Sequence, residues 1–263
     1  MKKLLAFDLD GTLLSGGELT PLTLETLEKC RAAGHYIVVA TGRTTRHAQR
    51  IMDMIKPHGA SLSDGACGYV GDQLITEQTI PHSQALAILD RLEKHPDIST
   101  IIINTSQGYL QSTDFPPGLA IRQDLRDATT TTPLAEMKKS IKNHGPYAFV
   151  LTSKNAHVGA EIAQDFPDLY VLNYEGFCII RPKTSDKWYA LEKVAQALGV
   201  PNADIIAFGD NDNDLQMLTH SGIGVAMGNA TDGAKNAADY ICDTNKADGV
   251  AHWLRNNLLC YKP

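Results

Sequence analysis

The sequence predicts an α/β fold, a doubly wound parallel sheet of the Rossmann-like kind, with an α+β domain inserted into it. Short apolar runs alternate with helix-length segments at the start of the chain, and the same alternation returns after Pro182. Between these parts, strand and helix patterns follow one another without that order. We therefore expect a core domain of residues 1–80 plus 182–263 and an inserted domain of residues 81–181.

The first 80 residues are expected to form two strand–helix pairs and then a hairpin. Thr20 can cap the first helix and Gly34 can end it. The turn of the hairpin falls at Gly71-Asp72, between two short extended pieces. The expected elements are strands at 3–7 and 36–40, helices at 21–33 and 44–55, and the hairpin within 65–75.

The inserted and final segments differ in how their expected elements are ordered. The insertion is expected to contain helices at 83–94, 134–143 and 156–165, strands at 101–103, 148–151, 170–172 and 177–180, and a rigid loop at Phe115-Pro116-Pro117. The final segment is expected to contain helices at 185–198, 212–219, 232–237 and 247–258, alternating with strands at 205–208, 223–226 and 240–242. That alternation is typical of a parallel sheet with helices on both faces.

Composition excludes several classes of protein. Of the 263 residues, 43% are hydrophobic and 21% charged, which is an ordinary globular balance. The net charge of −6, the absence of a basic run and the 6% aromatic content argue against a nucleic-acid partner. No stretch reaches the ~18 apolar residues that a membrane helix needs, so no membrane partner is expected. The five cysteines form no CxxC pair and the N-terminus lacks a signal-peptide pattern, which together favour a cytoplasmic protein.

The first candidate catalytic residues lie at the end of the first expected strand. An apolar run leads directly into Asp8 and Asp10, and Gly11 and Thr12 follow. Two carboxylates so close repel each other unless a positive charge lies between them. A divalent metal ion between the two carboxylates would remove this repulsion. A metal site of this kind indicates an enzyme that acts on a phosphate group.

Three further polar clusters accompany this one. Thr41-Gly42-Arg43 follows the second strand, Gly209 to Asp214 follows the strand at 205–208, and Lys187 opens a helix. Three of the four clusters thus follow parallel strands, at the sheet edge where open α/β sheets bind ligands. Each cluster alone has an ordinary explanation as a turn, a helix cap or a solvated lysine. A calcium loop is rejected for the acidic segment, because Leu215 and Ser221 stand where such a loop needs Gly and Glu.

Together the clusters resemble the four motifs of the haloacid dehalogenase-like superfamily, and more narrowly those of its Cof-type sugar-phosphate phosphatases. The segment 223–230 and the long insertion are also similar, so the resemblance spans nearly the whole chain. It implies a phosphatase core and a cap domain that closes over the site and selects the substrate. It also implies a Mg²⁺-dependent phosphatase that hydrolyses small phosphorylated metabolites, with sugar phosphates as the expected class, through an aspartyl-phosphate intermediate.

The resemblance also implies roles for individual residues. Asp8 would be the nucleophile, Asp10 the general acid and base, and Lys187 the cation that faces the phosphoryl oxygens and holds Asp8. The metal would be held by Asp8, Asp10 (through its backbone carbonyl), Asp210 and Asp214, and the substrate phosphate by Thr41, Gly42, Arg43, Lys187 and Asn213.

Two positions leave alternatives open. Lys183 lies only four residues before Lys187, and either lysine could face the phosphate; the position at a helix start favours Lys187. Asp64-Gly65-Ala66 stands where the family usually carries Asn-Gly-Ala. An acid at residue 64 would repel a phosphate unless it is protonated or turned away, and it is expected to narrow specificity.

Two other functions use similar residues. A phosphomutase or phosphotransferase would pass the aspartyl-phosphate to another hydroxyl group with the same motifs. A receiver-type signalling domain also places an aspartate and Mg²⁺ at a sheet edge, but it is about half as long and has no insertion. The expected partner is therefore a small phosphorylated substrate, and the protein is expected to be a monomer or a homodimer.

Overall fold

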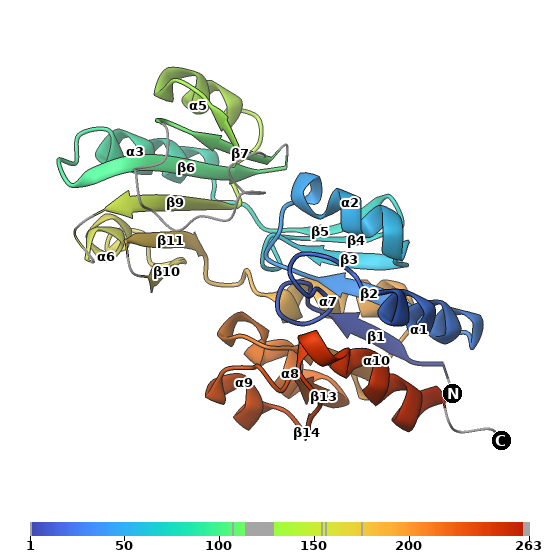
Figure 1. Ribbon diagram of the computed structural model, residues 1–263. Helices are drawn as coiled ribbons and strands as arrows, with labels where there is room; N and C mark the ends of the chain where they lie inside the picture. Colours follow the sequence, from blue (N-terminus) through green and yellow to red (C-terminus); the bar gives the residue numbers. More distant parts are fainter. Residues whose placement is uncertain are drawn as a thin grey trace. The chain divides into compact units, whose positions relative to one another are not determined.

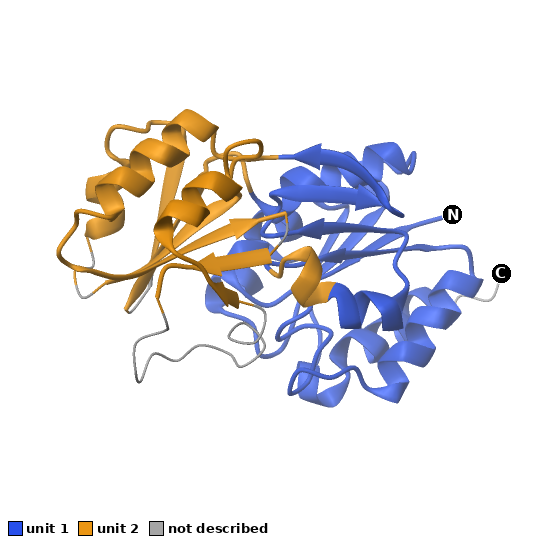
Figure 2. Cartoon of the chain, turned by 90° about the horizontal axis from the view of Figure 1, so that it is seen from above, with its two compact units in different colours: residues 1–42, 49–77, 186–263 blue, residues 43–48, 78–185 orange. Residues whose placement is uncertain are grey.

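The computed structural model describes residues 2–106, 108–113, 129–153, 155, 157–174 and 176–259. The chain divides into two compact units (Figure 2). Unit 1 comprises Met1–Gly42, Gln49–Glu77 and Asp186–Pro263, and unit 2 comprises Arg43–Ala48 and Gln78–Ser185. The expected loop at Phe115-Pro116-Pro117 lies outside the described residues. The domain limits 1–80 plus 182–263 and 81–181 stay predictions.

Unit 1 contains, within the described residues, an eight-stranded sheet in the order β14-β13-β12-β1-β2-β3-β4-β5. Neighbouring strands from β14 to β3 are parallel, whereas β4 and β5 are antiparallel. The strands are β1 (Leu4–Phe7), β2 (Tyr36–Ala40), β3 (Gly59–Leu62), β4 (Cys67–Val70), β5 (Gln73–Glu77), β12 (Ile205–Gly209), β13 (Ile223–Ala226) and β14 (Tyr240–Ile241). The predicted parallel-sheet core is confirmed.

Helices pack on both faces of this sheet (Figure 1). They are α1 (Pro21–Ala32), α7 (Lys187–Ala197), α8 (Leu215–His220), α9 (Asp232–Ala237) and α10 (Gly249–Leu254, continued by a π-helical turn at Arg255–Leu259), while α2 (Thr45–Ile55) crosses the division between the units. Leu4 and Ala6 of β1 share a core with Leu191 of α7. On the other face, Phe7 stacks on Phe208, with ring centroids 5.2 Å apart. Burial on both faces explains why β1 is a continuous apolar run.

The helix ends follow the local sequence. Thr20 caps α1, since its hydroxyl accepts from the backbone N–H of Thr23 at 3.1 Å. Gly34 has a φ of +90°, the left-handed conformation that glycine adopts most readily after a helix. The helix expected from residue 185 begins instead at Lys187. Asp186 is its N-cap and accepts from the backbone N–H of Tyr189 at 2.7 Å.

Three strands carry no clear strand pattern, and the sequence does not predict them. Among these, β3 lies inside the sheet between β2 and β4, although its sequence is only Gly-Ala-Ser-Leu. A Cβ atom added at Gly59 would lie 2.7 Å from the backbone oxygen of Tyr69, so small residues are required there. The other two, β7 (Gly108–Gln111) and β8 (Thr129–Thr131), lie at one edge of the unit 2 sheet.

Unit 2 has its own sheet, six-stranded in the described residues, in the order β10-β11-β9-β6-β7-β8. All described pairs are antiparallel except β7 and β8. Its other elements are β6 (Ile98–Thr105), β9 (Ala148–Ser153), β10 (Leu169–Tyr174), β11 (Phe177–Pro182), α3 (His82–Leu92), α5 (Leu134–Ser140) and α6 (Val158–Ala163). Its helices and sheet enclose a separate hydrophobic core. The predicted α+β insertion is confirmed as a fold class.

Gly65 lies in the turn between β3 and β4, against the backbone that begins α7, and we expect its replacement to weaken the fold. It has a φ of +84°, and an added Cβ atom would overlap the carbonyl oxygen of Asp186. Gly65→Ala is expected to reduce the free energy of unfolding by about 3 kcal/mol or more, as measured by urea denaturation. Gly71→Ala is the matched control, because Gly71 has a φ of +54° and no neighbouring atom within 4 Å of an added Cβ. Equal losses in the two variants would contradict the role of the Asp186 contact.

Candidate active site

Three adjacent strands of unit 1 end in the polar residues that the sequence singled out. Asp8 follows β1, Thr41 follows β2 and Asp210 follows β12. Because β1 pairs in parallel with both of its neighbours, these three residues lie at the same sheet edge. The backbone N–H of Asp8 donates to the carbonyl of Phe208 at 3.0 Å, which extends the pairing of β1 and β12 to the site.

Carboxylates gather at this edge. Among the described residues, oxygen atoms of Asp8, Asp210 and Asp214 lie within 4.8 Å of one another. Asp8 is 4% exposed and Asp214 is fully buried. An all-oxygen set of this kind suits a hard divalent cation such as Mg²⁺. The donor atoms present therefore fit the expected metal.

Lys187 supplies the positive charge of the cluster. Its side chain is 2% exposed, and its Nζ atom lies 2.7 Å from Oδ1 of Asp8 and 2.7 Å from Oδ1 of Asp214. Burial alone would lower the pKa of Lys187, but the carboxylates of Asp214, Asp8 and Asp64 outweigh it and raise the pKa. The alternative, Lys183, is exposed and belongs to unit 2. Of the two lysines, Lys187 is the one that contacts Asp8.

Burial raises the pKa values of two carboxyl groups in this cluster. Burial raises the pKa of Asp8 well above its usual value, against the opposing effect of the Lys187 charge. Burial also raises the pKa of Asp210 to about 6, although the hydrogen bond from Thr12 opposes that shift. A cation bound between them would favour their ionised forms, which is the behaviour expected of metal ligands.

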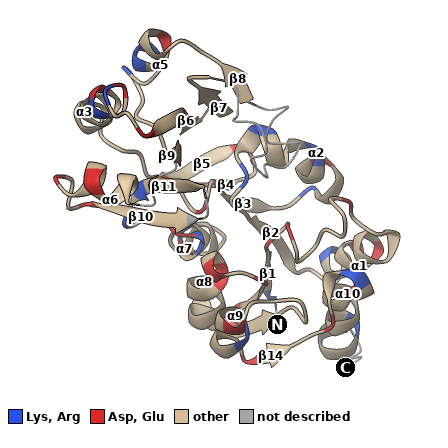
Figure 3. Ribbon diagram, turned by 60° about the vertical axis from the view of Figure 1, so that its left-hand side comes forward, with Lys and Arg blue, Asp and Glu red and all other residues tan. Residues whose placement is uncertain are grey.

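Asp214 ties the acidic loop to Lys187. Its Oδ2 atom accepts from the backbone N–H groups of Asp210 at 2.9 Å and Asn211 at 3.0 Å, while Oδ1 accepts from Lys187. The loop forms a short 3₁₀ turn, Asp212–Asp214, that leads into α8, and Figure 3 draws red acidic ribbon beside the α8 label. Both oxygens of Asp214 thus already have partners. Its predicted role as a metal ligand stays a prediction, and its contacts favour positioning of Lys187.

Asp10 stands beside this cluster without belonging to it. It is half-buried, and its charge is one of those that raise the pKa of Asp210. Gly11 follows with a φ of +88°, and a Cβ atom there would overlap the carboxylate of Asp210. Glycine therefore allows the first loop to approach Asp210 closely. The predicted acid–base role of Asp10 and its backbone ligation of a metal stay predictions.

The residues expected to hold the phosphate lie on neighbouring loops. Thr41 is buried, and its carbonyl accepts from the backbone N–H of Asp64 at 3.2 Å. Asn213 donates from Nδ2 to Oδ1 of Asp64 at 2.8 Å. Arg43 falls in unit 2, whereas Gly42 belongs to unit 1. The phosphate-binding roles of Thr41, Gly42, Arg43, Lys187 and Asn213 stay predictions.

Two supporting residues escaped the sequence reasoning. Thr12 donates from its hydroxyl to Oδ1 of Asp210 at 2.9 Å and is 2% exposed. Asn229 donates from Nδ2 to the carbonyl of Gly11 at 2.9 Å. Both lie in segments that carried the resemblance, the first motif and residues 223–230. Their hydrogen bonds join loops that are far apart in the sequence, so only the folded chain shows the roles of these side chains.

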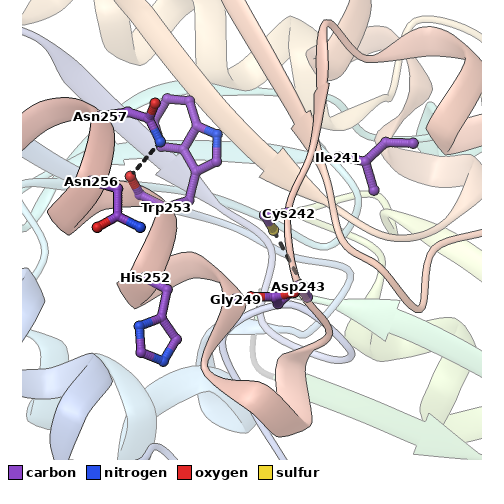
Figure 4. Close-up of a pocket in the computed structure, with 8 residues that line it drawn as sticks. All are labelled: Ile241, Cys242, Asp243, Gly249, His252, Trp253, Asn256 and Asn257. Carbon is purple, nitrogen blue, oxygen red and sulfur yellow. Dashed lines mark hydrogen bonds between the residues drawn. The ribbon is translucent and has the colours of Figure 1, made fainter.

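A pocket in another part of unit 1 contains none of these residues (Figure 4). Its volume is about 240 Å³. It is lined by Ile241, Cys242, Asp243, Gly249, His252, Trp253, Asn256 and Asn257. The amide of Asn257 donates to the carbonyl of Trp253 at 2.9 Å. No residue of the carboxylate–lysine cluster lines this pocket, so we assign it no part in phosphate chemistry.

Unit 1 thus has an α/β fold with a buried aspartate, Asp8, directly after β1 inside its sheet. The family model of the haloacid dehalogenase-like hydrolases matches residues 5–254. The chain therefore belongs to the haloacid dehalogenase-like hydrolases. The family expected from the motifs is confirmed.

Relatives match over almost the whole chain. The 5-amino-6-(5-phospho-D-ribitylamino)uracil phosphatase YcsE of Bacillus subtilis is 28% identical, over 96% of this chain and 96% of its own. The pyridoxal phosphate phosphatase YbhA of Escherichia coli is 26% identical, over 98% and 99%. The solved structure of the subclass IIB sugar phosphatase BT4131 is 25% identical, with a TM-score of 0.81 over 97% of this chain and 98% of that one. The expected enzyme class, a phosphatase, is confirmed.

Within the part of the chain that the structure describes, no helix combines the length and the apolar character needed to cross a bilayer.

Proposed function

We propose that this protein is a Mg²⁺-dependent phosphatase that cleaves small phosphorylated metabolites, sugar phosphates above all, through an aspartyl-phosphate on Asp8. The observation that carries the proposal is the buried contact of 2.7 Å between Lys187 Nζ and Asp8 Oδ1, beside the carboxylate of Asp210. The relatives that are named for a substrate act on small phosphate monoesters, which supports the same substrate class.

Asp8 would attack the phosphorus atom of the substrate, and Asp10 would transfer the protons in both steps of the reaction. One oxygen of Asp8 is held by Lys187, so the carboxylate is oriented before substrate arrives. An Asp8 oxygen forms a bond to phosphorus while the bond from phosphorus to the leaving oxygen breaks, and Asp10 donates its proton to that oxygen. Asp10 then takes a proton from water, which attacks phosphorus. The bond between Asp8 and phosphorus breaks, and inorganic phosphate leaves.

The remaining residues would hold charge and position. Asp8, Asp210 and the backbone carbonyl of Asp10 would hold Mg²⁺, with Asp214 close by. When bound, the ion would offset the repulsion between carboxylates and phosphate and would orient the phosphoryl group. The amine of Lys187, the hydroxyl of Thr41 and the backbone N–H of Gly42 would donate to the phosphoryl oxygens. Asn213 and Arg43 complete the proposed phosphate contacts.

Metal removal tests the proposal directly. Phosphate release from p-nitrophenyl phosphate and from a panel of sugar phosphates, nucleotides and phosphorylated cofactors is expected to fall at least about 100-fold in EDTA. Added Mg²⁺ is expected to restore it, and Ca²⁺ is expected to restore far less, because Ca²⁺ prefers more ligands at longer distances. Full activity in EDTA would contradict the metal assignment.

The same panel of substrates distinguishes a phosphatase from a phosphotransferase. Adding a second sugar as acceptor separates hydrolysis from transfer of the phosphoryl group, because a transferase would make a new phosphate ester.

We propose a monomer or homodimer that acts in the cytoplasm on small molecules and binds no nucleic acid. Sedimentation of the purified protein measures the oligomeric state.

A further inference from the structure

Asp64 is held at the active site by an unusual backbone conformation. Ser63 and Asp64 both have a φ of +53°, and Gly65 follows with a φ of +84°. Left-handed conformations are unfavourable for residues with a Cβ atom, although aspartate and asparagine tolerate them better than most. The backbone N–H of Asp64 donates to the carbonyl of Thr41 at 3.2 Å, which fixes the turn against the loop after β2. Such a turn directs the side chain to one place.

The carboxylate of Asp64 lies among the residues proposed to bind phosphate. It accepts from Nδ2 of Asn213 at 2.8 Å. It also covers Gly42, where an added Cβ atom would lie 2.9 Å from Oδ1 of Asp64. Its charge is one of three that raise the pKa of Lys187, which faces the nucleophile. Asp64 thus contacts two of the proposed phosphate ligands, Asn213 and Gly42, and its charge acts on a third, Lys187.

The hydrogen bond alone does not require an acid at this position. An asparagine has the same shape, accepts from Asn213 through its own amide oxygen and tolerates the left-handed backbone equally well. The carboxylate differs only in its charge. That charge adds to those of Asp8, Asp210 and Asp214, and Lys187 contacts the carboxylates of Asp8 and Asp214.

We propose that the negative charge of Asp64 weakens the binding of phosphate anions at this site, while its carboxylate holds Asn213 and Gly42 in place. The proposal rests on the proposed function, because it takes Gly42, Lys187 and Asn213 as the phosphate ligands. A fixed anion close to the phosphate favours release of the inorganic phosphate product. It also raises the concentration of substrate needed to fill the site.

The test measures binding of inorganic phosphate by calorimetry in the presence of Mg²⁺. Asp64→Asn is expected to bind phosphate about fivefold more tightly than the unaltered protein, from the Coulomb energy of nearby charges in a partly buried site. Its inhibition constant for phosphate and its KM for p-nitrophenyl phosphate are expected to fall by a similar factor. Asp72→Asn is the matched control, because Asp72 is exposed in the β4–β5 turn and loses the same charge.

The outcomes separate this proposal from the proposed function. Unchanged or weaker phosphate binding by Asp64→Asn, with a thermal midpoint like that of the unaltered protein, overturns the role of the charge and leaves a structural hydrogen bond. Tighter binding that Asp72→Asn shares also overturns it. If the unaltered protein hydrolyses no ester but the Asp64→Asn effect on phosphate binding is found, the proposed function fails and the role of Asp64 stands.

Discussion

Replacing Asp8 with Asn is expected to reduce phosphate release from p-nitrophenyl phosphate by about 1,000-fold or more. The amide of asparagine is a poor nucleophile and cannot form the aspartyl-phosphate. It also carries no charge to pair with Lys187, which lies 2.7 Å from the carboxylate. The measurement is the turnover rate with saturating Mg²⁺.

The same variant is expected to remain folded. Burial, and then the charges of Asp214 and Asp210, disfavour a charge on Asp8, and the substitution keeps the shape of the side chain. Lys187 loses one carboxylate partner but keeps Asp214. The thermal midpoint is therefore expected to be unchanged or higher. Asp72→Asn, on an exposed turn, is expected to retain full activity. Normal turnover by Asp8→Asn would exclude Asp8 as the nucleophile.

Replacing Lys187 with Met is expected to damage both stability and activity. The substitution leaves the carboxylates of Asp8 and Asp214 buried without their cation. Breaking a buried ion pair in this way costs about 3–5 kcal/mol, measured as the loss in free energy of unfolding. Burial raises the pKa of the Asp8 carboxyl group and the charge of Lys187 opposes that shift, so the pKa of Asp8 would lie still further above that of the unfolded chain. The folded state is therefore expected to weaken as the pH rises through the range between the unfolded and the folded pKa of Asp8.

Lys183→Met is the control for this prediction. Lys183 lies four residues earlier and is exposed. Its replacement is expected to change the free energy of unfolding by less than about 0.5 kcal/mol. If Lys183→Met lost activity and Lys187→Met kept it, the choice between the two lysines would be wrong.

The core strands could be predicted because burial on both faces gives them continuous apolar sequences. β1 and β2 are of this kind, and their loops were recognisable from the polar residues that follow. β3 was missed because its position in the sheet depends on small residues, and Gly59 lies directly against Tyr69. The start of α7 was placed too early because Asp186, rather than an earlier residue, supplies the cap.

The sequence predicts those parts of the site that depend only on the topology of the sheet. Parallel strands end at one edge, so the meeting of Asp8, Thr41 and Asp210 follows from the alternation of strands and helices. The contact between Asp64 and Asn213 does not follow, because it depends on the left-handed turn at residues 63–65. Such turns have no hydrophobic periodicity, and their side-chain directions come only from the folded chain.

The central position of β1 has a consequence for synthesis of the protein. Its partner on one side, β12, pairs Leu4 with Ile205 and so follows it by about 200 residues. At the usual speed of translation, roughly 10–40 s pass between the emergence of the two strands from the ribosome. Until β12 has been made, the edge of β1 that it covers has no partner from this sheet, and an open apolar edge is prone to pairing with other chains.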